Sequence, residues 1–207
     1  MKYITLLFFF IIALFGSNSK EILVLHSYND GLKWSDGITS GIKEIIEKYP
    51  NLELTIEHMD SKKIDNQEYF DTLINLYEKK FSNRKYDVII SVDNYAYEFV
   101  LKNHKKLFNS SALVFCGVEN FDEKQIPKEL KSEVTGVIEY KELKKNIELI
   151  KDVIKELNIL YIISDDSFSS LAIKEQILND SKEFEKDVKI IFDNQIDINT
   201  ISEKINN

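Results

Sequence analysis

Short apolar runs alternate with segments of helical spacing through the first half of the chain. The apolar runs are Ile22–Leu25, Leu52–Met59, Tyr86–Val92 and Ala112–Val118. Between them, apolar residues recur about every three or four positions, which is the spacing of one buried helix face. Strands that alternate with helices in this order are typical of a parallel sheet covered by helices on both faces. The sequence therefore predicts an α/β fold.

Individual segments predict where two strands lie and where two helices begin. Leu52–Met59 alternates apolar and polar residues, so we expect one wetter face and a position near a sheet edge. Tyr86–Val92 is apolar enough for the centre of a parallel sheet. Asp65–Glu68 has the spacing of a capping box, which indicates the start of a helix. Asp93 and Asn94 can cap the helix that follows the third strand.

After residue 120 the alternation loosens and then resumes. We interpret residues 121–140, which include a charged stretch around Pro127, as a crossover or hinge region. An N-terminal α/β lobe is predicted at 20–120, and part of a second α/β lobe at 141–207. We expect a two-lobe plan, each lobe a parallel sheet with helices on both faces, with the second lobe incomplete in this chain. Strand or helix patterns mark the second lobe at Ile159–Ser164, Val188–Phe192 and Ile198–Ile205.

Residues 1–19 have the features of a secretory signal peptide. Lys2 supplies a positive charge, the apolar run Tyr3–Phe15 follows, and small residues precede a cut after Ser19. A membrane-spanning helix needs about 20 apolar residues, so this run favours a cleaved signal over an uncleaved anchor. We therefore expect an exported protein, in the periplasm or on the extracellular face of the cytoplasmic membrane.

Charge and cysteine content restrict the partners and the covalent chemistry. The chain has 27 Lys and Arg against 35 Asp and Glu, a formal net charge of −8. Nucleic acids and anionic membrane surfaces attract clustered cations, so we expect no nucleic-acid partner. Cys116 is the only cysteine. No intramolecular disulfide can form, and the fold must depend on its core.

Polar and aromatic residues follow several predicted strands, at the edge of a parallel sheet where ligands bind. For Asp93, Asn94 and Asp165, a helix cap is an equally good interpretation, because capping residues are of these types. For Tyr28 and Trp34 the alternative is ordinary packing under the loop. The candidate ligand-binding residues are Ser27, Tyr28, Trp34, Asp93, Asn94, Gly117, Glu119, Glu139 and Asp165.

Signatures of catalysis and of metal binding are weak. Cys116 and His26 lie near the ends of strands that could be neighbours, but a Cys–His pair needs hydrogen-bond reach, and free cysteine is commonly buried. The three histidines, at 26, 58 and 104, lack the spacing of a metal site. No phosphate-binding loop, dinucleotide-binding glycine pattern or nucleophile elbow occurs. We expect a protein that is not an enzyme and holds no cofactor or metal.

Five segments between Glu21 and about Asp166 carry a family resemblance: LVLHSYNDGLKWSDGITSGI, IEHMDSKK, YDVIISVDNYAYEFV, LVFCGVENFD and TGVIEY. In this order they resemble the extracytoplasmic domains called ABC transporter substrate-binding protein-like, which are similar in plan to type I periplasmic binding proteins. The resemblance implies two lobes that close on a small ligand in the cleft between them. It implies ligand contacts from the candidate residues above, with Glu139 near the hinge and Asp165 in the second lobe.

The resemblance leaves two roles open. In many members such a domain is the sensor of a membrane histidine kinase or diguanylate cyclase, whereas others are free binding proteins that serve an ABC permease. We interpret the chain as the sensor part of a membrane signalling receptor, with a free transporter binding protein as the alternative. A secreted α/β enzyme using Cys116 or the Asp93 and Glu119 carboxylates, and a truncated non-functional product, are further alternatives. The acidic candidates favour an amino-acid-like or donor-rich small-molecule ligand.

Overall fold

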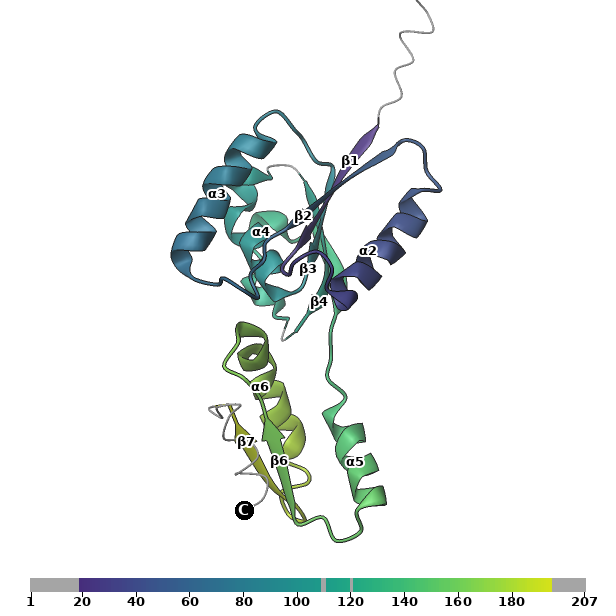
Figure 1. Ribbon diagram of the computed structural model, residues 1–207, viewed down its shortest axis with the longest axis vertical. Coiled ribbons are helices and arrows are strands. Elements are labelled where there is room, and N and C mark those ends of the chain that lie inside the picture. Colours follow the sequence, from purple (N-terminus) through teal and green to yellow (C-terminus); the bar gives the residue numbers. More distant parts are fainter. Residues whose placement is uncertain (1–18, 109–110, 120, 195–207) are drawn as a thin grey trace, which may run out of the picture. The chain divides into compact units, whose positions relative to one another are not determined.

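The computed structural model describes residues 19–108, 111–119 and 121–194, and Figure 1 shows the order of its elements. These residues form two compact units. The first unit comprises the chain up to Cys116 together with Lys124–Val137. The second unit comprises Gly117–Glu123 and the chain from Ile138 onward.

A five-stranded sheet organises the first unit, with the strand order β2-β1-β3-β4-β5. β1 pairs in parallel with β2 and with β3, and β3 pairs in parallel with β4. Backbone hydrogen bonds from Leu113 to Glu133 and from Glu139 to Val118 run in ascending order, so β5 is also parallel. The strands are β1 (Lys20–His26), β2 (Leu52–His58), β3 (Val88–Val92), β4 (Ala112–Val118) and β5 (Val134–Ile138).

Helices cover both faces of this sheet (Figure 1). α2 (Lys33–Ile46) lies on one face, and α3 (Gln67–Phe81) and α4 (Asn94–Leu107) lie together on the other. Complete burial of a large apolar side chain contributes about 1.5–3 kcal/mol, so the core beneath these helices holds the unit together. Its most deeply buried apolar side chains include Leu23, Leu25, Tyr77, Ile89 and Val100.

The predicted α/β fold class is confirmed. All four strands predicted for the N-terminal lobe are present, with Leu52–His58 at a sheet edge and Val88–Val92 at its centre, as expected. The helix predicted from the Asp65–Glu68 pattern is present, but its N-cap is Asn66, one residue later than the Asp65 of the predicted capping box. The Asn66 side chain accepts a hydrogen bond from the Tyr69 amide at 2.9 Å at the start of α3.

The second unit contains a two-stranded parallel sheet and two longer helices among its described residues. α5 (Leu143–Val153) and α6 (Phe168–Ser181) pack against each other, and β6 (Ile159–Ile163) pairs with β7 (Lys189–Asp193). Parallel sheets are normally covered on both faces. Here alternate side chains of β6 stay between 37% and 55% exposed, which agrees with a second lobe that this chain builds only in part.

The position of β5 differs from the predicted domain boundaries. This strand lies within residues 121–140, interpreted above as a crossover or hinge region. In the structure Lys124–Val137 belongs to the first unit, where β5 forms the edge of the sheet beside β4. Gly117–Glu123, by contrast, belongs to the second unit. Between Pro127 and β5, the short 3₁₀ helix Lys128–Leu130 buries Leu130 in the first unit.

Two sequence predictions lie outside the described residues. The signal segment 1–19 is described only at Ser19, and the helix expected at Ile198–Ile205 follows the last described residue. Within the described ranges, the helices are all too short or too polar to cross a membrane.

The close approach of β5 to β4 at Gly136 generates a stability prediction. A Cβ atom at Gly136 would lie 2.3 Å from the carbonyl oxygen of Phe115 and 2.4 Å from its ring Cγ. We expect Gly136→Ala to lower the free energy of unfolding by about 1–3 kcal/mol, because the strands must separate to admit the methyl group. Urea denaturation of the purified protein measures this change.

A matched glycine provides the control. Gly41 lies inside α2, and a Cβ there would meet nothing within 4 Å. Gly41→Ala should raise the free energy of unfolding by about 0.5–1 kcal/mol, because alanine loses less backbone entropy in a helix. Equal unfolding midpoints for wild type and Gly136→Ala would contradict the described packing of β5 on β4.

Candidate functional site

The carboxyl ends of β1 and β3 lie side by side in the sheet. The two strands pair in parallel with His26 opposite Val92, so the residues after them leave the sheet at the same edge. Ligands bind beyond this edge in open parallel sheets. We call the candidate residues there the first-unit site: Ser27, Tyr28, Trp34, Asp93 and Asn94.

Ser27 supports this site from inside the fold. Its side chain is 0% exposed. The hydroxyl donates to the carbonyl oxygen of Val92 at 2.9 Å and accepts from the amide of Ala96 at 2.8 Å. These bonds tie the end of β1 to β3 and to α4. Ser27 was expected to contact a ligand, but both bonds hold its hydroxyl within the protein.

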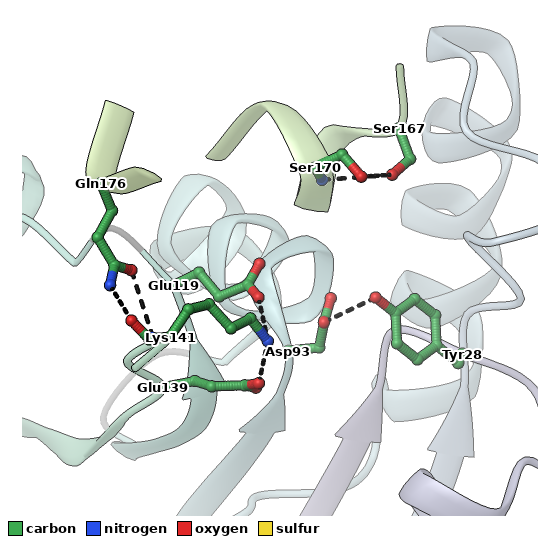
Figure 2. A network of polar contacts seen from close by, with 8 residues as sticks. All are labelled: Tyr28, Asp93, Glu119, Glu139, Lys141, Ser167, Ser170 and Gln176. Atoms are coloured by element: carbon green, nitrogen blue, oxygen red, sulfur yellow. Dashed lines mark hydrogen bonds and ion pairs between the residues drawn. The ribbon is translucent and has the colours of Figure 1, made fainter. Parts of the chain in front are cut away.

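Asp93 joins the helix cap to the loop after β1. It begins α4 with a positive φ of 76°, which is uncommon for a residue other than glycine. One carboxylate oxygen accepts from the Tyr95 amide at 3.5 Å, and the other accepts from the Tyr28 hydroxyl at 2.8 Å (Figure 2). The capping interpretation is therefore correct for Asp93, and the same carboxylate positions Tyr28. The adjoining Asn94 is only 4% exposed.

Two aromatic rings form the accessible part of the first-unit site. The rings of Tyr28 and Trp34 lie 6.0 Å apart at 60°. Trp34 is 39% exposed, so a large apolar surface faces outward there. The ammonium group of Lys62 lies 5.1 Å from the centre of the Tyr28 ring. This aromatic pair offers flat surfaces for stacking or cation–π contacts.

The chain after β2 holds the loop that carries Tyr28. The Met59 amide donates to the carbonyl of His26 at 2.8 Å, and the Ser61 hydroxyl donates to that of Ser27 at 2.6 Å. Nδ1 of His58 lies 3.0 Å from the next carbonyl, that of Tyr28. Three consecutive carbonyls of the loop are thus fixed by one segment.

His26 is a buried, neutral residue beneath the site. It is 0% exposed, and its Nε2 lies 2.8 Å from the Thr39 hydroxyl. Its ring stacks on His58 with centroids 4.9 Å apart. Burial, followed by the nearby charge of His58, lowers the pKa of His26 from 6.5 to about 4. His26 therefore stays uncharged at neutral pH.

The suggestion that His26 and Cys116 could lie on neighbouring strands is wrong. β3 lies between β1 and β4, with His26, Val92 and Cys116 aligned across the three strands. Two strand spacings separate the outer pair by roughly 10 Å. Burial, followed by the charge of Asp93, raises the pKa of the Cys116 thiol to about 11. Both features oppose a nucleophilic Cys–His pair.

A second polar cluster lies in the second unit, around Lys141. Its ammonium group forms ion pairs with Glu119, at 2.9 Å, and with Glu139 (Figure 2). Burial lowers the pKa of Lys141, but the hydrogen bonds to the two carboxylates outweigh it and raise the pKa. The Gln176 side chain of α6 donates to the Lys141 carbonyl at 2.6 Å. Glu119 and Glu139 were predicted, and the structure brings them together on one lysine.

The two remaining candidates have local roles in the second unit. The Asp165 carboxylate accepts from the Ser167 amide at 3.1 Å and from the hydroxyls of Ser167 and Ser170. The Ser167 hydroxyl caps α6 by accepting from the Ser170 amide at 3.3 Å. Asp165 thus orders the cap, as its alternative interpretation suggested. Gly117 has a φ of 67°, a conformation that favours glycine at the end of β4.

Four residues of these sites were not selected from the sequence: His58, Lys62, Lys141 and Gln176. Only His58, at the end of a predicted strand, had a positional signal, because every strand of a parallel sheet ends at the same edge. Lys62, Lys141 and Gln176 look like ordinary surface residues in the sequence, and only the packing of distant segments brings them to the sites.

The cavities of the first unit lie elsewhere. One of about 860 Å³ has Leu101, His104, Ser111, Pro127 and Leu130 in its lining, and one of about 250 Å³ lies between α3 and α4. Tyr28, Trp34 and Asp93 line neither of these two cavities. Among the residues that the structure describes, no three His, Cys, Asp or Glu side chains gather as a metal site would require.

Comparison with known proteins gives matches in fold only. No protein-family model and no curated protein matches the sequence. A conserved domain protein from Vibrio cholerae matches with a TM-score of 0.64 at 13% identity, over 89% of this chain and 60% of that one. The ABC domain in complex with L-Trp from Streptococcus pneumoniae matches with a TM-score of 0.63 at 17% identity, over 89% of this chain and 60% of that one. The leucine-binding protein LivK from Thermotoga maritima matches with a TM-score of 0.58 at 13% identity, over 89% of this chain and 51% of that one.

These matches establish the class of fold. The α/β architecture resembles that of the matched structures, which include a leucine-binding protein. The chain spans about 60% of the length of the first structures it matches. At these identities the likeness concerns the fold, and the roles of individual side chains rest on their own geometry.

The buried His26 predicts a pH dependence of stability. Its pKa is lower in the folded protein, about 4, than the ordinary 6.5, so the unfolded chain takes up a proton first as the pH falls. Stability from this residue is therefore complete above pH 6.5 and is lost towards pH 4, by about 3 kcal/mol. Urea unfolding between pH 4 and pH 7 measures the slope.

A single variant assigns this slope to His26. His26→Gln should flatten it, because the side chain no longer titrates. The same slope in wild type and His26→Gln would contradict a buried neutral His26.

Proposed function

We propose that the protein is an exported, non-enzymatic solute-binding domain that uses the first-unit site to contact a small molecule. The observation that carries the proposal is the linked group Tyr28, Trp34 and Asp93 at the carboxyl ends of adjacent strands. On a sheet of this fold, that edge is where ligands are expected. Binding proteins with the same fold support the proposal.

The chemistry of the site favours a ligand with a hydrogen-bond donor and an apolar or flat part. The Asp93 carboxylate already accepts the Tyr28 hydroxyl, and carboxylate oxygens can accept further bonds. Trp34 and Tyr28 supply the flat surfaces. Amino-acid-like solutes combine an amino group with an apolar side chain. The matched structures named for L-Trp and for leucine support this class of ligand.

We further propose that the domain serves as the sensor of a membrane signalling receptor, with a transporter-feeding role as the alternative. The sequence resemblance described above supports both roles. Sequence downstream of Asn207 distinguishes them. A membrane-spanning segment followed by a kinase or cyclase module would support the sensor, whereas a stop codon soon after a completed lobe would support the transporter role.

Binding is favoured over catalysis by the state of the candidate nucleophile. Cys116 has a thiol whose pKa is raised to about 11, and β3 separates it from His26. A secreted enzyme using this cysteine would need a thiolate near neutral pH. Solute binding that is unchanged in Cys116→Ala would weaken that alternative further.

The proposal predicts stabilisation by a specific solute. Purified protein lacking residues 1–19 would be heated with a panel of amino acids, nucleobases and sugars. At a solute concentration about 100 times its Kd, binding stabilises a protein by about 2.7 kcal/mol, which raises the Tm by about 5–10 °C. An amino-acid-like compound is expected to produce such a shift.

Variants at two exposed aromatic residues locate the binding surface. Trp34→Ala should weaken binding of the stabilising solute at least about tenfold, because the loss of a buried aromatic contact is costly. Tyr49→Ala, at a 53% exposed ring beyond the end of α2, should leave binding unchanged. No stabilisation by any compound, or equal binding by wild type and Trp34→Ala, would contradict the proposal.

A further inference from the structure

His58 occupies a special position relative to the loop of the first-unit site. It is the last residue of β2, and one face of its ring stacks on the buried His26. Its Nδ1 lies 3.0 Å from the Tyr28 carbonyl oxygen, and its Nε2 lies 3.9 Å from the Asp30 carboxylate. Both nitrogens therefore face the binding loop, which we define as residues Ser27–Trp34.

The contacts fix the tautomer of the neutral ring. A carbonyl oxygen only accepts hydrogen bonds, so Nδ1 of His58 must carry a proton and donate it to Tyr28. In the neutral ring, Nε2 then presents a lone pair towards the negative Asp30. A second proton makes Nε2 a donor and turns this contact into an ion pair. The charged ring thus holds the loop at both Tyr28 and Asp30, whereas the neutral ring holds it only at Tyr28.

The two rings of the stacked pair differ in their access to water. His26 is fully buried, and its pKa is lowered to about 4. His58 is 22% exposed in its side chain, so it can exchange protons with water. The charged groups around the pair are Asp30 of the binding loop and Asp36 of α2. Lys62 lies over the ring of the neighbouring Tyr28.

We propose that His58 is a positioning residue whose protonation fixes the binding loop, so that solute affinity rises as the pH falls through the range in which histidine titrates. The proposal rests on the solute-binding function proposed above, because it assigns a regulatory property to the same site. Histidine is the side chain whose charge ordinarily changes between about pH 5 and 8.

Fixing the loop before the solute binds strengthens binding, because less conformational entropy is then lost when the solute binds. Side chains and loops that are mobile before binding lose entropy on binding, and preorganisation removes that loss. The further bonds from the segment after β2, from Met59 and Ser61, come from an amide and a hydroxyl. They do not titrate in this range. His58 is therefore the support through which pH acts on the binding loop, by way of its contact with Asp30.

The fluorescence of Trp34 tests loop fixation without any solute. Trp34 is the only tryptophan of the sequence, and it lies against Tyr28. Its emission, followed from pH 8 to pH 5 in purified protein lacking residues 1–19, should show one transition. His58→Gln should abolish this transition. His104→Gln should retain it, because His104 bonds to the Ser111 carbonyl at the other end of α4.

A second variant keeps the test decisive if His58→Gln folds poorly. The Asp30 side chain is 90% exposed, so Asp30→Asn should fold normally. It removes the charge that a protonated His58 contacts, and it should move the transition to lower pH and reduce its amplitude. A transition that persists in His58→Gln, or that is identical in wild type and Asp30→Asn, would overturn the proposal. The absence of any transition between pH 8 and pH 5 in wild type would overturn it as well.

The affinity measurement completes the test. With the stabilising solute from the panel, titration calorimetry should give a Kd about threefold lower at pH 5.5 than at pH 8, the scale of one exposed ion pair. His58→Gln should show no such difference, and if it did, the proposal would fail. Because the fluorescence transition needs no solute, a failure of solute binding and a failure of the His58 mechanism give different results.

Discussion

Parallel pairing of β1 with both β2 and β3 is the constraint on which the first-unit site depends. It places the ends of three strands at one sheet edge, so that Ser27, His58 and Asp93 leave the sheet together. The buried hydroxyl of Ser27 then joins β1 to β3 and α4, and the Asp93 carboxylate joins the α4 cap to Tyr28. Loss of this register would separate every one of these groups.

Much of this arrangement was predictable because it follows local patterns. Apolar alternation located the strands, put Leu52–His58 at an edge and Val88–Val92 at the centre. Asp93 caps α4 as predicted, and the capping pattern at Asp65 lies one residue before the true N-cap of α3. These features depend on residues close in sequence. The assignment of β5 to the first sheet was missed, because strand order is decided by contacts between distant segments.

The roles of single side chains were harder to predict for the same reason. Ser27 was chosen as a ligand contact, but the amide of Ala96 and the carbonyl of Val92 use its hydroxyl. Lys141 had no sequence signal, although its ion pairs organise Glu119 and Glu139 in the second unit. A polar residue after a strand identifies the right edge of a sheet, but only the folded neighbours decide whether it faces solvent or the core.

The measurement that tests the solute-binding site most directly is a map of amide chemical-shift changes in two-dimensional NMR spectra on addition of the stabilising solute. We expect the chemical-shift changes in the first unit to be largest at Ser27–Trp34 and Val92–Tyr95, where the ends of β1 and β3 meet. Changes centred instead on the cavity lined by Leu101 and Pro127, with none at Tyr28 or Trp34, would contradict it.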